Sequence, residues 1–227
     1  MATTISGLSR SGSDAIAGDQ CVAMHGLDWK AYRTMLRLRG ERPAPKMVYL
    51  DGSLELVSPS YLHERLAIRL GQFVMEVVVG LDIPCIPTGR TTLRRKKRRG
   101  GVEGDETFYL ANATRVLGVD QIDLRRVPPP DLAIEAVHTH GARAALEVYR
   151  RLGVPEVWVC DGEALRIFVR QADGAYARSE SSVVLPFLGA AEIHEWVARP
   201  RIASETEWVK GLRDWVRDTL APRRAGP

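Results

Sequence analysis

The stretch "PDLAIEAVHTHGARAALEVYRRLGVPEVWVC", residues 130–160, carries three secondary-structure signals in succession. "PDLAIEAV" is a short apolar run that begins directly after prolines, which is typical of a buried strand. "GARAALEVYRRLG" then places Val148 and Tyr149 on one apolar helical face, and Gly153 stands where a helix C-cap is expected. "PEVWVC" is a second strand. A strand–helix–strand unit predicts a right-handed crossover between parallel strands.

Two further segments predict antiparallel strands. "KMVYLDGSLELVSPS" has two apolar runs around Asp51-Gly52, the dipeptide that tight two-residue turns favour, and "PEVWVCDGEALRIFVR" has Asp161-Gly162 near its turn. These hairpins belong to the same sheet as the crossover or to an adjoining one. With helices expected near 27–38, 60–79, 191–198 and 204–219, the chain is predicted to be α/β, a mixed β-sheet flanked by helices.

Length and composition are those of an ordinary soluble globular protein. The chain has 227 residues, 45% hydrophobic and 26% charged, without an apolar run long enough for a transmembrane helix. Neither a secretory signal nor CxxC spacing is present, and Cys21, Cys85 and Cys160 are scattered, so we expect a cytoplasmic protein without disulfides. We expect a disordered tail over 1–20, one domain over 21–200, and a C-terminal helix and tail over 201–227.

One block of positive charge stands out from a net charge of only +4. It comprises Arg94, Arg95, Lys96, Lys97, Arg98 and Arg99. Six consecutive cations repel one another, so the block is not expected to form a core element. A solvated loop, a localisation tag and a phosphate-binding arm all remain open from this feature alone.

Two carboxylates stand on strands that otherwise read as core. Asp105 lies in "VEGDETFYL", and Glu135 interrupts the apolar run of "PPPDLAIEAV". An unpaired buried carboxylate is costly, so Glu135 needs a partner, either an arginine or a metal ion. Asp105 is either a loop acid or a second ligand of the same ion. Its neighbours Glu103 and Glu106 are expected to be exposed.

Four motifs occur in order: "LELVSPSYLHE", "TTLRR…GVEGDETFYL", "PPPDLAIE" and "YRRLGVPEVWVCDG". They resemble the putative restriction endonuclease family of the PD-(D/E)XK nuclease superfamily, from about Leu27 to Leu188. The resemblance implies that residues 21–200 form a nuclease-like domain, a mixed sheet flanked by helices. It also implies hydrolysis of phosphodiester bonds in DNA with Mg²⁺ or Mn²⁺, because a bound hard cation activates water and stabilises charge on phosphate.

The resemblance also assigns roles to individual residues. Asp105 corresponds to the metal-binding Asp, Glu135 to the second carboxylate and Glu64 to an acid that an early helix contributes to the catalytic site. The backbone carbonyl of Ala136 is expected as a further metal ligand. His63, beside Glu64, shares a helical stripe with leucines and is expected to be a core histidine. The basic run 94–99 is expected to bind nucleic acid.

The sequence departs from the family pattern at its lysine. The two positions where a catalytic lysine is expected hold Val137 and Ala145. An arginine such as Arg143, a lysine of the basic run, or nothing must take that role. The usual Pro-Asp dipeptide is also replaced by Gly104-Asp105, which is expected to loosen the backbone there. A weakened nuclease and an inactive nuclease fold that binds nucleic acid or a partner therefore both remain open, as does a structural protein without nucleic acid.

Two other features bear on ligands and partners. His138 and His140 are potential zinc ligands, but the sequence shows no third ligand, so we expect no zinc site. Related folds often act as dimers, and the tail helices with Trp208 and Trp215 offer an interface for a homodimer.

Overall fold

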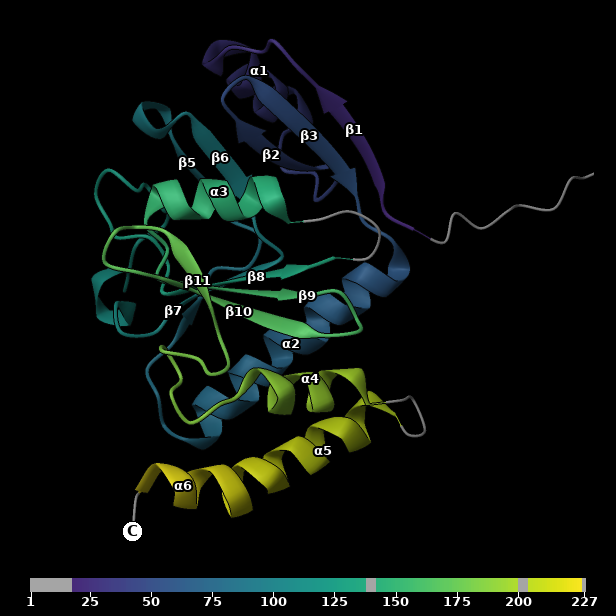
Figure 1. The fold of residues 1–227 in the computed structure, drawn as a ribbon, viewed down its shortest axis with the longest axis vertical. Coiled ribbons are helices and arrows are strands. Elements are labelled where there is room, and N and C mark those ends of the chain that lie inside the picture. The colour runs from purple at the N-terminus through teal and green to yellow at the C-terminus, as the bar shows by residue number, and fades with distance from the viewer. Residues whose placement is uncertain (1–17, 138–141, 200–203, 226–227) are drawn as a thin grey trace, which may run out of the picture.

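Two β-sheets carry the fold in the computed structural model, which describes residues 18–137, 142–199 and 204–225 (Figure 1). The first sheet has the order β1-β3-β2-β6-β5 and is antiparallel throughout. Its strands are β1 (Gln20–Met24), β2 (Lys46–Leu50), β3 (Ser53–Ser58), β5 (Thr92–Arg95) and β6 (Gly100–Glu103).

The second sheet has the order β11-β10-β9-β8-β7-β4 and is mixed. Its strands are β4 (Ile86–Pro87), β7 (Glu106–Tyr109), β8 (Leu132–Ala136), β9 (Glu156–Cys160), β10 (Leu165–Arg170) and β11 (Tyr176–Ser179). Strands β8 and β9 are parallel, as the crossover predicted, and the other pairs are antiparallel. The mixed α/β prediction is therefore confirmed.

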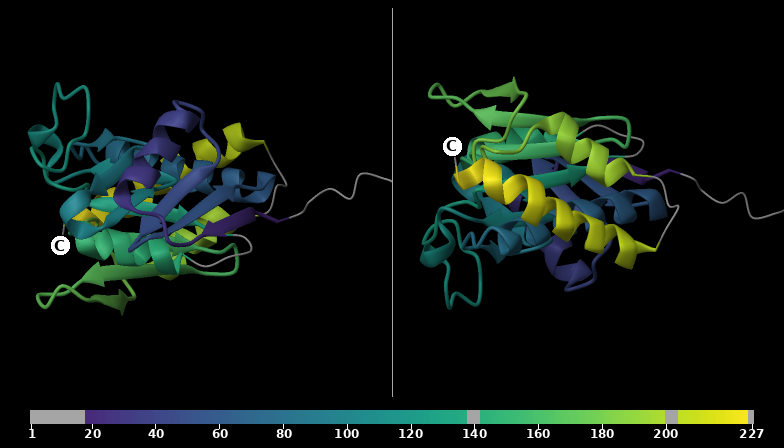
Figure 2. Two further views of the ribbon diagram at one scale, coloured as in Figure 1. Left: turned by 90° about the horizontal axis from the view of Figure 1, so that it is seen from above. Right: turned by 90° about the horizontal axis from the view of Figure 1, so that it is seen from below.

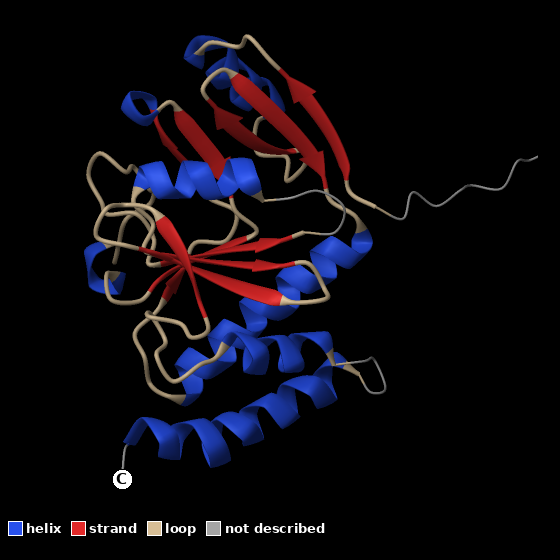
Figure 3. Cartoon of the chain, viewed as in Figure 1, coloured by secondary structure: helices blue, strands red, loops and turns tan. Residues whose placement is uncertain are grey.

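Helices cover both sheets (Figure 3). They are α1 (Trp29–Arg39), α2 (Tyr61–Gly80), α3 (Arg143–Leu152), α4 (Ala190–Ala198), α5 (Glu205–Trp215) and α6 (Ala221–Ala225). Short 3-10 turns occupy Lys96–Arg98 and Ala113–Arg115, and a π-helical turn, Val216–Leu220, joins α5 to α6. No helix among the residues that the structure describes is both long and apolar enough to span a membrane.

The elements stack in layers. Helix α3 lies between the two sheets, α1 covers the outer face of the first sheet, and α2 and α4 lie under the second sheet (Figure 1). Seen from below, α5 and α6 form one continuous rod beside α4 (Figure 2). The largest core lies under the second sheet and includes Phe73, Trp158 and Leu212. A second core around Val148 and Val157 holds α3 between the sheets.

Several local signals form as their sequences predicted. Asp51 and Gly52 both have positive φ, 49° and 96°, which gives the tight turn that joins β2 to β3. Ser60 caps α2 by accepting the backbone N–H of His63. Gly153 ends α3 in the left-handed conformation. The starts of β2 and α2 lie at the candidate site, where Lys46 and His63 contact Asp105.

Strands β1 and β6 were not expected from the sequence. Strand β6 begins with Gly100-Gly101, and paired glycines read as loop because they lack packing side chains. In the structure the Tyr32 hydroxyl occupies the space where a side chain of Gly101 would begin. The glycine is therefore needed for the close approach of α1 to the first sheet.

The segment after residue 203 packs on the rest of the chain through Arg69 of α2. The Arg69 side chain is buried and donates hydrogen bonds to the carbonyls of Val197 (3.0 Å) and Arg199 (2.8 Å). It also pairs with Glu205 at 3.0 Å and lies over the ring of Trp208. The predicted division at 20 and 200 stays a prediction, and residues 1–17 lie outside the described part of the chain.

Replacing Arg69 with methionine should lower the free energy of unfolding by about 3 kcal/mol, because the buried carbonyl of Val197 and the partly buried carbonyl of Arg199 lose their donor. Urea denaturation followed by tryptophan fluorescence measures the change. Arg213→Gln is the matched control in the same layer: Arg213 is exposed and pairs with Glu76, so its loss should change stability by less than about 1 kcal/mol. Equal losses in both variants would show that Arg69 is not the anchor of α5.

Candidate functional site

Two buried carboxylates meet at one lysine. Asp105, directly before β7, lies 2.6 Å (Oδ1) from Nζ of Lys46, and Glu135 of β8 lies 3.2 Å (Oε2) from the same atom. Exposure is 0% for Asp105, 5% for Glu135 and 4% for Lys46, so little water reaches the group. Because both carboxylates contact one ammonium, both lie within reach of a single cation.

The second oxygen of Asp105 is held by the backbone of the neighbouring strand. Its Oδ2 accepts the N–H of Ala136 at 2.8 Å, and the N–H of Asp105 itself donates to the carbonyl of Ile134 at 3.1 Å. These two bonds fix the carboxylate against the C-terminal half of β8. The arrangement therefore follows from the pairing of β7 with β8.

His63, in the first turn of α2, links Asp105 to the N-terminal segment. Its Nε2 lies 3.0 Å from Oδ1 of Asp105, and its Nδ1 lies 3.1 Å from Oδ2 of Asp19. Burial would raise the pKa of Asp19, but the N–H of Ser60 and the His63 ring outweigh it and lower this pKa to about 2. The histidine is buried, as expected, and both its ring nitrogens face carboxylates.

Glu135 is oriented from α3. Tyr149 donates its hydroxyl hydrogen to Oε1 of Glu135 at 2.6 Å. The hydroxyl reaches this position past Gly104, where an added Cβ would lie 2.5 Å from the tyrosine oxygen. The glycine that replaces the usual proline is thus required for space, beyond the looser backbone that the sequence suggested.

Replacing Gly104 with alanine should displace Tyr149 from Glu135 and cost about 1–3 kcal/mol of stability, because the new methyl group overlaps the ring hydroxyl. Urea denaturation measures the loss. Gly211→Ala in α5 is the control: its added methyl meets nothing closer than 3.9 Å, so the variant should be slightly stabilised by its higher helix propensity. An unchanged midpoint for Gly104→Ala would refute the packing argument.

Lys46 was missed as a site residue in the sequence. Val137 and Ala145, the expected lysine positions, line a small cavity of about 40 Å³ together with Lys46 and Glu135. A lysine from β2 therefore enters the space that a lysine from α3 would have filled. A signal was available: Lys46 and Val48 are two residues apart on an inward-facing strand, so the lysine shares a buried face.

Burial and charge act in opposite directions on these groups. Burial by itself would lower the pKa of Lys46, but the charges of Glu135 and Asp105 raise it above its ordinary value. Burial would raise the pKa of Asp105, and Lys46 and His63 more than offset this, so its pKa is lowered. The pKa of Glu135 is raised, chiefly by burial. Asp105 and Lys46 are thus a charged pair in a nearly dry site.

Other buried acids in the chain have structural partners. The prediction that Glu103 is exposed is wrong: it is buried, bonded to Arg39 at 2.5 and 2.9 Å, and accepts the N–H of Met47. Asp131 accepts N–H groups from the loop after β7. Glu106 is half-buried rather than exposed. Only Asp105 and Glu135, among the described residues, share a lysine in this way.

The structure does not bring every expected residue to this cluster. Glu64 is one residue beyond His63, which turns it about 100° around the helix, and it forms an ion pair with Arg90 instead. Its catalytic role stays a prediction. Ala136 takes part in the cluster through its backbone N–H, which donates to Asp105. The role of its carbonyl as a metal ligand stays a prediction as well.

The basic run 94–99 lies away from the carboxylates. It ends β5 and forms the exposed turn before β6, and Gly100 pairs with Leu50. Lys46 begins β2 and Leu50 ends it, so the turn and the carboxylates are roughly 13 Å apart along that strand. The pair His138 and His140 falls outside the described residues.

The donor set fits a hard divalent cation. Within residues 18–137, 142–199 and 204–225, no group of three or more His, Cys, Asp and Glu side chains is placed to hold a metal ion. Mg²⁺ commonly uses one or two carboxylates and completes its shell with waters, whereas zinc prefers nitrogen and sulfur ligands. The cavity of about 40 Å³ beside Glu135 has room for a water molecule.

Comparison with known proteins gives two findings. The family model Uma2, described as putative restriction endonuclease, matches residues 29–196. A similar solved structure is the crystal structure of a putative nuclease belonging to DUF820 from Anabaena variabilis ATCC 29413, with 13% identity, 71% of this chain and 96% of that chain covered, and a TM-score of 0.51. At this identity the likeness concerns the fold alone. No curated protein matches the chain.

Proposed function

Because this chain belongs to the putative restriction endonuclease family, we propose that it is a nuclease that uses Mg²⁺ or Mn²⁺ to hydrolyse phosphodiester bonds in DNA. The observation that supports this best is the convergence of Asp105 and Glu135 on the single ammonium of Lys46. Two carboxylates at the distance of one cation are the ligands that Mg²⁺ commonly takes from a protein.

Each residue has a distinct role in this proposal. A bound ion would act as a Lewis acid and lower the pKa of a water. Asp105 and Glu135 would hold that ion. Lys46 would donate to the phosphate oxygen that gains negative charge, the role that the family gives to a helix lysine. Such a preorganised donor is effective because the site is dry and the donor does not need to be reoriented.

The remaining contacts keep the ligands in position. The Ala136 N–H and the His63 ring fix the two oxygens of Asp105, and Tyr149 fixes one oxygen of Glu135. Bonds of this kind hold metal ligands in the orientation they need for binding.

The position of Lys46 also favours a second candidate function. The ammonium of Lys46 already contacts both carboxylates, so it can serve as a permanent internal cation in place of a metal. The chain would then be an inactive nuclease fold that binds nucleic acid or a partner.

The two candidates differ in a direct assay. Purified protein is incubated with labelled single-stranded and double-stranded DNA in Mg²⁺, in Mn²⁺ or in EDTA. The nuclease predicts cleavage in either metal and none in EDTA. Binding without cleavage under all conditions would reject the nuclease and leave the internal-cation alternative.

A further inference from the structure

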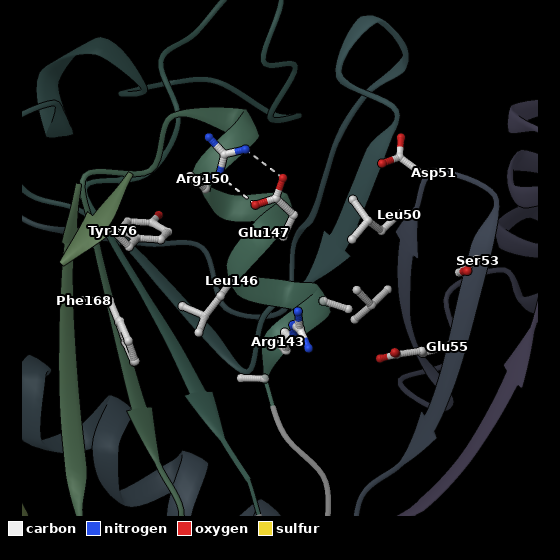
Figure 4. A pocket seen from close by; sticks show the side chains of 13 residues that line it. Leu50, Asp51, Ser53, Glu55, Arg143, Leu146, Glu147, Arg150, Phe168 and Tyr176 are labelled. Carbon is white, nitrogen blue, oxygen red and sulfur yellow. Dashed lines mark hydrogen bonds and ion pairs between the residues drawn. The ribbon is translucent and has the colours of Figure 1, made fainter. Parts of the chain in front are cut away.

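An open cleft of about 990 Å³ lies beside the candidate site (Figure 4). Its floor is α3, with Arg143, Leu146 and Arg150. One wall is formed by β2 and β3, and the other by β10 and β11, which contribute Phe168 and Tyr176. Figure 4 shows these two rings on the wall opposite the β2–β3 hairpin.

The β10–β11 wall alternates cations and aromatic rings. Residues two apart on a strand share a face, so Arg166, Phe168 and Arg170 of β10 face the same way. In the antiparallel register, Phe168 is opposite Arg178 and Arg170 is opposite Tyr176. Directly opposed residues also share a face. The wall that carries the two rings therefore carries three arginines beside them.

Most of the positive charge around the cleft is not neutralised. Arg143, Arg170 and Arg178 have no carboxylate partner among the described residues, whereas Arg150 pairs with Glu147 and Arg166 with Asp161. On the opposite wall, Asp51 is already paired with Arg151 at 2.6 Å and with Arg99 at 3.3 Å. Arg143 in the lining of the cleft, and Arg170 and Arg178 on the strand face that carries the two rings, are thus available to an anionic ligand.

The cleft continues into the candidate site. Val48, Glu55 and Ala142 line both the cleft and the small cavity that contains Lys46 and Glu135. Glu55 is the one acid of the cleft lining without a hydrogen-bond or ionic partner in the described chain, and it stands at this junction. A cation held by the neighbouring carboxylates would offset its charge there.

We propose that this cleft binds a single strand of nucleic acid. Bases stack on Phe168 and Tyr176, and the phosphates contact Arg143, Arg170 and Arg178. Grooves for single strands combine positive charge with aromatic rings, because every unpaired base offers a flat face. Bases inside a duplex are stacked on one another and cannot use such rings. The cleavage of single-stranded substrate rests on the proposed nuclease function; the binding does not.

Binding is tested by fluorescence anisotropy of the full chain in EDTA, so that cleavage plays no part. The probes are a labelled single-stranded DNA, a single-stranded RNA of the same sequence and the corresponding DNA duplex. Arg170→Gln/Arg178→Gln should bind single strands about 10-fold or more weakly, with a salt dependence reduced by about 1.4 in slope. The control Arg213→Gln/Arg217→Gln removes equal charge from α5 and the π-helical turn that follows it, and should bind as the parent does.

Stacking has its own pair of variants. Tyr176→Leu should weaken single-strand binding about tenfold, whereas Tyr176→Phe, which keeps the ring, should bind within about twofold of the parent. Comparison of the DNA and RNA probes identifies the sugar that is accepted.

Three results would overturn the cleft proposal: tighter binding of the duplex, equal loss in the control Arg213→Gln/Arg217→Gln, or no loss in Arg170→Gln/Arg178→Gln. If Arg170→Gln/Arg178→Gln loses binding and the parent protein cleaves nothing with Mn²⁺, the cleft proposal is supported and the nuclease proposal is rejected. If the parent cleaves DNA and the variant cleaves it equally well, the nuclease proposal is supported and the cleft proposal is rejected.

Discussion

Replacing Lys46 with methionine should lower the free energy of unfolding by about 3–5 kcal/mol in metal-free buffer. The substitution keeps a side chain of similar length and removes only the charge. Asp105 and Glu135 would then face each other in a site where their exposures are 0% and 5%. The loss arises mainly from leaving two buried carboxylates without a counter-charge.

The measurement is urea denaturation in EDTA and again in Mn²⁺. Mn²⁺ should restore part of the lost stability, because the ion supplies charge to the two carboxylates that methionine leaves unpaired. Lys210→Met is the matched control, since Lys210 pairs with Glu207 on the exposed face of α5 and should contribute less than about 1 kcal/mol. A loss below 1 kcal/mol for Lys46→Met would show that the lysine does not hold the site together.

The effect on catalysis separates the two candidate functions. If Lys46 stabilises charge on the phosphate, the methionine variant should cleave DNA about 100- to 1000-fold more slowly than the parent. If Lys46 is an internal substitute for the metal, the parent is inactive and the variant binds Mn²⁺ more tightly than the parent. Calorimetric titration with Mn²⁺ distinguishes these outcomes without a cleavage assay.

Asp105→Asn and Glu135→Gln should each abolish metal-dependent cleavage, with a loss of at least about 100-fold. Both substitutions keep the shape of the side chain and remove a negative charge, so metal affinity should fall together with the rate. Cleavage of labelled DNA in Mn²⁺ and Mn²⁺ titration provide the two readouts. Circular dichroism checks that each variant is folded.

Glu195→Gln is the control for these variants, because Glu195 lies on the exposed face of α4. Full activity in either Asp105→Asn or Glu135→Gln would show that the substituted residue is not a required ligand of the proposed metal ion. Activity lost in all three variants would indicate a general effect of charge rather than a specific site.

Much of the fold could be predicted because its signals are local. The turn at Asp51-Gly52, the Ser60 cap and the Gly153 terminus each depend on a few neighbouring residues. The parallel pair β8–β9 followed from the length and order of strand, helix and strand. Strand β6 was missed because the need for glycine at position 101 comes from close contact with Tyr32, which lies far away in the sequence.

The two acids of the candidate site could be identified from the sequence, but the residues that contact them could not. Asp105 and Glu135 stand out in sequence because a carboxylate in an apolar run requires a partner. The pattern of "KMVYL" indicates that Lys46 is buried but not that it meets those acids, since their contact depends on how the first sheet lies over β8. Asp19, which lies within the tail 1–20 that was expected to be disordered, reaches His63 for the same reason.

The contributors to the site are scattered along the chain, from Asp19 in the N-terminal segment to Tyr149 in α3, and they belong to both sheets. A nascent polypeptide still on the ribosome, or a proteolytic fragment that stops short of α3, therefore lacks part of the machinery. If the chain is the proposed nuclease, it would cleave DNA only after both sheets have docked. Newly made chains would then be unable to damage nucleic acid before they fold, and the cleavage rate would report the amount of completely folded protein.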